Sequence, residues 1–367
     1  MLDFNFFVPT RLVHGEGCVQ KNSQYFEGMG RRAFIVTGPN SAKLSGALDD
    51  VTTVLADKGI EYEQFSEVEV NPSLDNVEVA SASARRFKPD FIVAIGGGSP
   101  LDAAKAVAVL VANDMAAAQL YDKNWPNQPL PILAIPTTAG TGSEVTPYSV
   151  LTIPEKETKQ GFGGPDLFPK VSFLDWRYTD SLPRGITIDT AVDALSHLVE
   201  GYLSTRANSA SDMLAMHGIR LWGRHRKALM HDDLTPEERD GFLVASALGG
   251  MTISHTGTTF VHALGYPLTY YHDIPHGQAN GLVIGGYLRF TERTAPDKVE
   301  NIIRWLDMDS LGEFAGMMDQ LFLGHKTIDH AELERYAQAA SETRNVANSL
   351  GDVTASVLAD ILKASVG

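Results

Sequence analysis

Cysteine is almost missing from this chain, which has one, Cys18, among 367 residues. A lone cysteine cannot form an intramolecular disulfide, and a chain of this length without disulfides is typical of a reducing compartment. We therefore expect a cytoplasmic protein.

Long apolar runs and positive charge are also scarce. The longest apolar run, residues 106–112, is far shorter than the about 20 residues that span a bilayer, and Asp3 lies where a signal peptide carries Lys or Arg. With 30 Lys and Arg against 45 Asp and Glu, the formal net charge of −15 repels nucleic acids and anionic lipids. We therefore expect neither a membrane nor a nucleic acid as a partner.

The composition that remains is that of a globular protein, with 44% apolar and 20% charged residues and enough length for two domains. In the first half, short apolar runs alternate with segments of helical periodicity, which is the βαβ pattern of a parallel sheet. The strand-like runs are residues 33–37, 62–65, 91–95 and 132–135, and the helix-like segments are 44–58 and 74–87.

After about Asp180 the strand-like runs stop and long helical patterns dominate, with residues 155–170 as a strand-and-loop connection before that point. We predict an α/β domain, residues 1–180, with a parallel sheet and flanking helices, followed by an all-helical domain, residues 181–367. The β-prone segment 4–13 is expected to be an edge strand, either within one chain or across a dimer.

Glycines follow the predicted strand 91–95 and precede a helix. Glycine lets backbone N–H groups approach an anion, and a helix N-terminus adds a positive dipole end, so this loop is predicted to bind phosphate. The alternative is an ordinary turn in which Ser99 caps a helix that starts at Pro100. The loop residues are Gly96, Gly97, Gly98 and Ser99.

A second loop of small residues, 136–144, follows the next strand. Loops at the carboxyl ends of neighbouring parallel strands are where open α/β sheets bind nucleotides. The two loops together therefore predict a nucleotide site.

Histidines are concentrated in the second half, where eight of the eleven lie between His197 and His276. Asp193 and His197 have the i,i+4 spacing of one helix face, and His262 and His276 follow. A carboxylate and three imidazoles can hold a divalent metal ion and leave a position open. The alternative for the Asp193–His197 pair is a hydrogen bond along one helix.

Four motifs carry a resemblance to a known family: GGGSPLDAAKA, PTTAGTGSEVTPYSVLT, DALSHLVEGY and HALGYPLTYYHDIPHGQANG. In this order they resemble the iron-containing (group III) alcohol dehydrogenases over nearly the whole chain. The resemblance implies a dinucleotide-binding α/β domain, a helical metal-binding domain, hydride transfer between NAD(P)H and a small alcohol or aldehyde, and a homodimer. It implies Fe²⁺ as the metal, with Zn²⁺ or another divalent ion as the alternative.

The resemblance also implies roles for individual residues. The metal ligands are Asp193, His197, His262 and His276. The pyrophosphate loop is formed by Gly96 to Ser99. The nicotinamide side is lined by Thr137, Thr138 and Ser143. Further cofactor contacts are Asp102 and Lys159.

Two positions depart from the family pattern. Many members carry a histidine where this chain has Tyr266, although HALGYPLT also occurs in the branch that resembles butanol and propanediol dehydrogenases. Because an imidazole exchanges protons near neutral pH more readily than a phenol, we expect a proton relay through His272, with Tyr266 shaping the pocket.

The second departure concerns the cofactor. Members that prefer NAD often carry Asp after the first strand of the cofactor domain, where this chain has Gly38, followed by Ser41 and Lys43. The missing carboxylate removes repulsion of a 2′-phosphate, and the lysine adds attraction, so NADP(H) is expected to be favoured over NAD(H).

Three other functions share parts of these patterns. A lyase that resembles dehydroquinate synthase uses the same fold, but it usually offers one Glu and two His and a strongly basic pocket. A relative of maleylacetate reductase would lack the metal, whereas all four ligand positions are filled here. A nucleotide-binding module without activity is the third.

Overall fold

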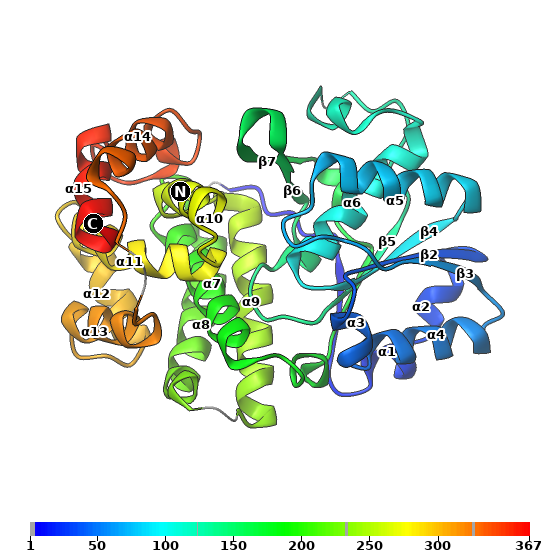
Figure 1. Ribbon diagram of the computed structural model, residues 1–367. Helices are drawn as coiled ribbons and strands as arrows, with labels where there is room; N and C mark the ends of the chain where they lie inside the picture. Colours follow the sequence, from blue (N-terminus) through cyan, green and yellow to red (C-terminus); the bar gives the residue numbers. More distant parts are fainter. Residues whose placement is uncertain (1–3, 123, 232–233, 325–326) are drawn as a thin grey trace. The chain divides into compact units, whose positions relative to one another are not determined.

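The computed structural model describes residues 4–122, 124–231, 234–324 and 327–367 (Figure 1). These residues form two compact units. One is an α/β unit, Val8–Leu182, and the other is a helical unit made of residues 4–7 and Pro183–Gly367.

A six-stranded parallel sheet is the centre of the α/β unit, as the sequence predicts. The strand order is β1-β8-β5-β4-β2-β3. The strands are β1 (Arg11–His14), β2 (Arg32–Thr37), β3 (Glu61–Phe65), β4 (Phe91–Gly96), β5 (Ile132–Pro136) and β8 (Val171–Leu174).

Helices cover both faces of this sheet, with α5 (Leu74–Phe87) and α6 (Gly98–Asn113) on one face and α1 (Cys18–Lys21) and α4 (Ala47–Asp57) on the other (Figure 1). Successive residues of a strand point to opposite faces. Phe34 accordingly packs in the α5–α6 core, and Ile35 packs in the opposite core. The interior strands are mostly apolar because both faces are buried.

The expected helix 44–58 is found as α4, and the short helix α3 (Ser41–Leu44) precedes it instead of continuing into it. The reason is Gly46, which has a φ of 78°, a left-handed conformation that interrupts a helix. A further short helix of this unit is α2 (Gln24–Glu27).

Two further strands, β6 (Tyr148–Ile153) and β7 (Thr158–Gly163), form a separate antiparallel hairpin. Strand β7 lies in the expected strand-and-loop connection 155–170, and β6 lies before it. The N-terminal apolar segment becomes a strand only in β1, which pairs with β8 of the same chain at the edge of the sheet. The within-chain pairing is therefore the one that the structure shows for β1.

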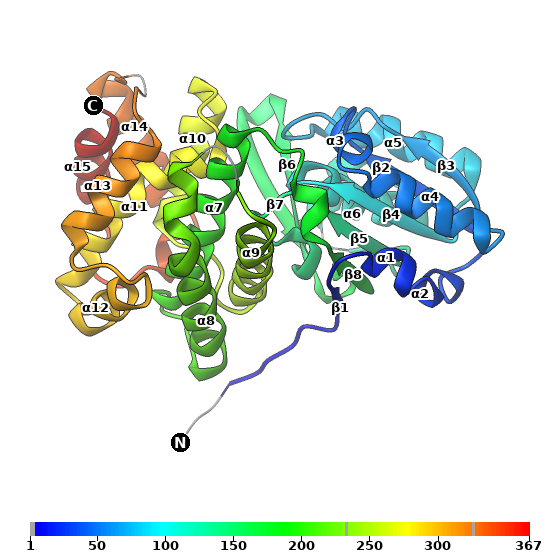
Figure 2. The ribbon, with the colours of Figure 1, turned by 90° about the horizontal axis from the view of Figure 1, so that it is seen from below.

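The second unit is helical, as predicted, and its described residues include only an isolated bridge, Ser204 to Ser349, as β pairing. Helices α7, α8 and α9 lie side by side in both views (Figures 1 and 2). The helices are α7 (Arg184–Tyr202), α8 (Ser209–His225), α9 (Pro236–Thr256), α10 (Phe260–His272), α11 (His276–Glu292), α12 (Pro296–Trp305), α13 (Leu311–Leu321), α14 (His330–Ser341) and α15 (Ala355–Val366). Over the described ranges, no helix is both long enough and apolar enough to cross a membrane.

Candidate metal and cofactor site

Helix α7 carries three polar residues four positions apart, on one face of a helix that is otherwise mostly buried and apolar. Asp193 and His197 are 3% and 5% exposed. Asp189, one turn earlier, accepts a hydrogen bond of 2.7 Å from the backbone N–H of Gln278 in the first turn of α11. This bond satisfies a free donor at the start of α11 and so fixes that helix against α7.

The start of α11 lies very close to α7. A β-carbon on Gly277 would stand 1.8 Å from the carbonyl oxygen of Asp189, so only glycine fits there. His276, the first residue of α11, is therefore held beside the polar face of α7, while His262 comes from α10.

The donor atoms of three predicted ligands, Asp193, His262 and His276, lie within 4.8 Å of one another. The fourth, His197, is outside this group but approaches Asp193 and His262. The Oδ1 atom of Asp193 lies 3.9, 3.7 and 3.8 Å from the Nε2 atoms of His197, His262 and His276. The Nε2 atoms of His197 and His262 are 3.0 Å apart. Donors bonded tetrahedrally to one ion at about 2.1 Å lie about 3.4 Å from each other. The 3.9 Å separation within the Asp193–His197 pair is too long for the i,i+4 hydrogen bond that was the alternative.

Glu200, three residues after His197 on α7, supports this cluster and is absent from the sequence-based set. Its Oε2 atom accepts a hydrogen bond from Nδ1 of His262, and its Oε1 atom accepts bonds of 2.7 and 2.8 Å from the N–H and hydroxyl of Thr259. The Nδ1 bond leaves the Nε2 atom of His262 as the nitrogen with the free electron pair, which is the arrangement of many metal-binding histidines. The Asp-x-x-x-His-x-x-Glu spacing could have indicated it.

The charges in the cluster are mutually stabilised. Burial alone would raise the pKa of Asp193, but His197, His276 and His262 lower it below its usual value. Burial likewise opposes ionisation of Glu200, and His262 outweighs it and lowers the pKa. An ionised carboxylate with three imidazoles is a donor set that suits Fe²⁺ or Zn²⁺, so the residues fit a divalent metal ion.

The cluster is open on one side. The side chain of His276 is 27% exposed, whereas that of His262 is 3% exposed. Tyr266 stacks on His276 with ring centroids 5.6 Å apart and an angle of 9° between the planes. Tyr266 therefore lies at the accessible rim of the cluster.

His272 lies elsewhere on α10, at its last residue. Its Nε2 atom is 3.0 Å from the hydroxyl of Tyr336 and 3.6 Å from a carboxylate oxygen of Glu332, both on α14. The structure thus brings Tyr266 to the predicted ligands and gives His272 partners on α14.

In the α/β unit, α6 begins two residues earlier than the alternative for the glycine loop requires. Gly97 is the N-cap and Gly98 the first helical residue, so Ser99 is not the cap. The Ser99 hydroxyl instead accepts a hydrogen bond of 3.1 Å from the N–H of Asn71, whose φ of 57° is left-handed. The capping interpretation of Ser99 is therefore wrong.

The two predicted cofactor loops pack together. A β-carbon on Gly97 would lie 3.1 Å from Thr138, and one on Gly98 would lie 2.6 Å from Thr141. The N–H of Thr137 donates to the carbonyl of Gly96 at 2.9 Å. The glycines thus have a packing role, and the long helix α6 begins at the carboxyl end of β4, where an anion would meet its N-terminus.

A buried ionic cluster lies beside these loops. The fully buried Lys105 donates to the hydroxyl and carbonyl of Ser143 at 2.7 and 2.8 Å and to the carbonyl of Tyr148 at 2.6 Å. Burial lowers the pKa of Lys105 to about 8, against the opposing effect of Asp102 and Glu144. Burial also raises the pKa of Glu144 to about 7.

Asp102 belongs to the same cluster and holds the hairpin. Its Oδ1 atom accepts a hydrogen bond of 2.6 Å from the Ser143 hydroxyl, and its Oδ2 atom accepts one of 2.9 Å from the N–H of Val150 in β6. Lys159 on β7 donates to the side-chain oxygen of Asn71 at 2.8 Å, so the hairpin is also linked to the loop that contacts Ser99.

Gly38, Ser41 and Lys43 lie at the end of β2 and in α3. A β-carbon on Gly38 would meet its nearest atom, the carbonyl oxygen of Val68, at 3.6 Å, which is ordinary contact. A side chain at position 38 is therefore tolerated, and Lys43 is exposed nearby in sequence.

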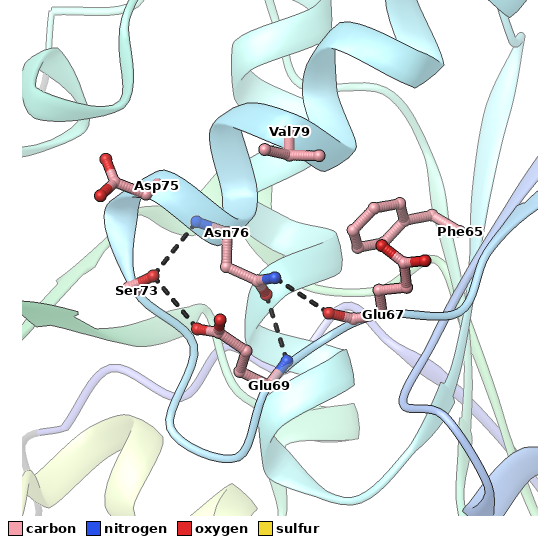
Figure 3. Close-up of a pocket in the computed structure, with 7 residues that line it drawn as sticks. All are labelled: Phe65, Glu67, Glu69, Ser73, Asp75, Asn76 and Val79. Carbon is pink, nitrogen blue, oxygen red and sulfur yellow. Dashed lines mark hydrogen bonds between the residues drawn. The ribbon is translucent and has the colours of Figure 1, made fainter.

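A separate cavity of about 400 Å³ lies at the end of β3 and the start of α5 (Figure 3). The Asn76 side chain spans its floor by donating to the carbonyl of Glu67 and accepting from the N–H of Glu69. Its three carboxylates would repel phosphate groups. The lining residues are Phe65, Glu67, Glu69, Ser73, Asp75, Asn76 and Val79, none of them a predicted cofactor residue.

Comparison with known protein families gives two matches that together span most of the chain. Residues 9–176 match the family described as iron-containing alcohol dehydrogenase. Residues 187–366 match the C-terminal part of the Fe-containing alcohol dehydrogenase family.

Individual relatives of the chain belong to the same kind of enzyme by name. The chain is 31% identical to the sulfoacetaldehyde reductase of Bilophila wadsworthia over 319 residues, which is 86% of this chain and 82% of that protein. It is 33% identical to the 1,3-propanediol dehydrogenase of Klebsiella pneumoniae over 331 residues, 89% of this chain and 81% of that protein. The crystal structure of an iron-containing alcohol dehydrogenase from Thermotoga maritima superposes with a TM-score of 0.92 at 41% identity and covers 100% of both chains.

Proposed function

The chain belongs to the iron-containing alcohol dehydrogenase family, and on that premise we propose that it interconverts a small alcohol and its aldehyde with Fe²⁺ and NADP(H). Its relatives named above are an alcohol dehydrogenase and an aldehyde reductase, which supports hydride transfer over the lyase and over a module without activity. In this proposal residues 1–180 bind the dinucleotide, and residues 181–367 hold the metal.

The observation that carries the proposal is the convergence of one carboxylate oxygen and three imidazole nitrogens within the helical unit. We assign Asp193, His197, His262 and His276 as the metal ligands. A divalent ion held there would act as a Lewis acid that polarises the substrate carbonyl. An intact set of four donors disfavours the metal-free relative of maleylacetate reductase.

The cofactor would be bound by the two loops at the carboxyl ends of β4 and β5. The backbone N–H groups at the start of α6 can hold the pyrophosphate, and the dinucleotide supplies the hydride. Lys105 and Asp102 fix Ser143 through hydrogen bonds, so they would orient the loop on the nicotinamide side. Thr137 and Thr138 would line that side, and Lys159 would contribute positive charge near Ser99.

Reduction of a carbonyl also needs a proton at the substrate oxygen. We propose that His272 delivers it through water and that Tyr266, stacked on His276, forms the wall of the substrate pocket. The hydroxyl of Tyr336, 3.0 Å from His272, would hold the imidazole in place.

NADP(H) is proposed over NAD(H) because no carboxylate occupies position 38 and Lys43 is exposed in the next helix. We also propose a homodimer, since Phe4, Phe6 and Phe7 in the N-terminal segment are 46%, 44% and 51% exposed. A reducing cytoplasm is consistent with Cys18, a buried free thiol whose pKa is raised to about 12 by burial and Asp175.

The test is a panel of aldehydes offered with NADPH and with NADH to protein reconstituted separately with Fe²⁺ and with Zn²⁺. The proposal expects cofactor oxidation that requires the metal and is faster with NADPH. Absence of turnover across the panel in both metal forms would contradict it.

A further inference from the structure

Asn280, one turn after His276 on α11, places its side-chain amide among the predicted metal ligands. The side chain is fully buried, and its Nδ2 atom lies 3.0 Å from Oδ1 of Asp193. The same nitrogen is 3.4 Å from the Nε2 atoms of both His262 and His276. One amide group therefore contacts three of the four donor atoms.

These neighbours determine which end of the amide faces the cluster. Asp193 presents a carboxylate oxygen, and Nε2 of His262 has a free electron pair because Nδ1 of that ring is bonded to Glu200. An amide oxygen in this position would face a carboxylate oxygen at 3.0 Å, which is repulsive, whereas the NH₂ group donates. The charges of the site therefore favour the orientation in which the NH₂ group of Asn280 faces the predicted ligands.

We propose that Asn280 is a positioning residue of the metal centre that holds Oδ1 of Asp193 toward the three imidazoles. A carboxylate can rotate about its terminal bond, and a fixed donor on one oxygen removes that freedom. This inference rests on the proposed function, because it takes Asp193 and the three histidines as the ligands.

Gly265 on α10 provides the space for this amide. A β-carbon on Gly265 would stand 2.3 Å from Oδ1 of Asn280, so any side chain at position 265 requires the amide to move. Oδ1 is buried without a hydrogen-bond partner among the described residues. The residue at position 265 therefore controls the position of Asn280 from a second helix, which gives an independent way to disturb it.

A purely structural role would have a different signature. If Asn280 only fills space between α10 and α11, its replacement lowers the melting temperature of the metal-free protein and leaves the metal affinity nearly unchanged. If it positions Asp193, the affinity itself falls, because the carboxylate must be ordered when the ion binds.

The experiment compares Asn280→Leu, which keeps the approximate size and removes the donor, with Gly265→Ala. The control is Gly285→Ala on α11, the helix that carries Asn280. No atom lies within 4 Å of the β-carbon added at Gly285. Each metal-free protein is melted, and its affinity for Co²⁺ is measured by competition with a coloured chelator. The visible spectrum of the Co²⁺ form is recorded as well.

We expect both test variants to bind Co²⁺ about 10- to 100-fold more weakly than the parent, with the number of ligands unchanged in the spectrum. The control should match the parent. If Asn280→Leu does not fold, Gly265→Ala provides the same comparison.

Affinities within about twofold of the parent would overturn the inference and leave the four ligands intact. A spectrum that shows one ligand fewer would also overturn it, because Asn280 would then bind the ion itself. Failure of the parent to bind Co²⁺ would instead contradict the proposed metal site.

Discussion

Gly277 lies so close to the carbonyl group of Asp189 that a β-carbon on Gly277 would stand 1.8 Å from the oxygen. The contact joins the first turn of α11 to α7, and these two helices supply three of the four predicted ligands. The placement of His276 relative to Asp193 thus depends on a backbone contact one residue away from the ligand.

Gly277→Ala should therefore displace α11 and destabilise the protein by at least about 2 kcal/mol. Denaturant unfolding of the metal-free protein measures the effect. Gly316→Ala on α13 is the matched control, since no atom lies within 4 Å of its added β-carbon. Equal free energies of unfolding for the two variants would show that α11 can move away from α7 without loss of stability.

Glu200→Gln tests the carboxylate behind His262. Glutamine can still accept the hydrogen bond from Nδ1, but it lacks the charge that holds the imidazole, so we expect metal affinity to fall about 10- to 100-fold. Chelator competition measures the affinity, with the exposed Glu300→Gln on α12 as the control. Unchanged affinity in the Glu200 variant would remove this residue from the site.

Gly38→Asp tests the choice of cofactor. A carboxylate at position 38 would repel a 2′-phosphate and accept a hydrogen bond from a free 2′-hydroxyl, so the ratio of kcat/KM for NADPH over NADH should fall about 10- to 100-fold. Gly38→Asn has nearly the same shape without the charge and should leave the ratio much closer to that of the parent. A parent enzyme that already favours NADH would show the proposed preference to be wrong.

Two residues of α10, His272 and Tyr266, are candidates for delivering the proton to the substrate. His272→Ala should lower kcat about 10- to 100-fold and flatten the pH–rate profile near neutrality, whereas Tyr266→Phe should stay within about threefold of the parent. The measurement is kcat against pH for aldehyde reduction. The opposite pattern would make the tyrosine hydroxyl the proton donor, as its place beside His276 allows.

Much of the α/β unit could be predicted from the sequence because its central strands are buried on both faces. The strands β2, β4 and β5 are continuous apolar runs, which is the clearest signal a parallel strand gives. Strand β8 has only four residues, VSFL, too few to show a period. The hairpin of β6 and β7 contains exposed polar and glycine positions, so its pattern is weak.

The ligand candidates could be predicted because an aspartate and histidines in this order and spacing are typical of a metal site. The spacing of Glu200 after His197 hints at a supporting residue, but which atoms the supporting residues contact depends on packing between segments distant in the chain. Glu200 meets His262 across 62 positions, and Gly277 meets the backbone of Asp189. The role proposed for Asn280 depends on the packing of α10 against α11, where Gly265 of α10 faces the amide.

The central claim is that one divalent ion binds per chain through Asp193 and the three histidines. It is tested most directly by elemental analysis of the parent and of His276→Ala after reconstitution with Fe²⁺ and removal of unbound metal. We expect about one ion per chain in the parent and a large loss in the variant. Equal occupancy in the two proteins would contradict it.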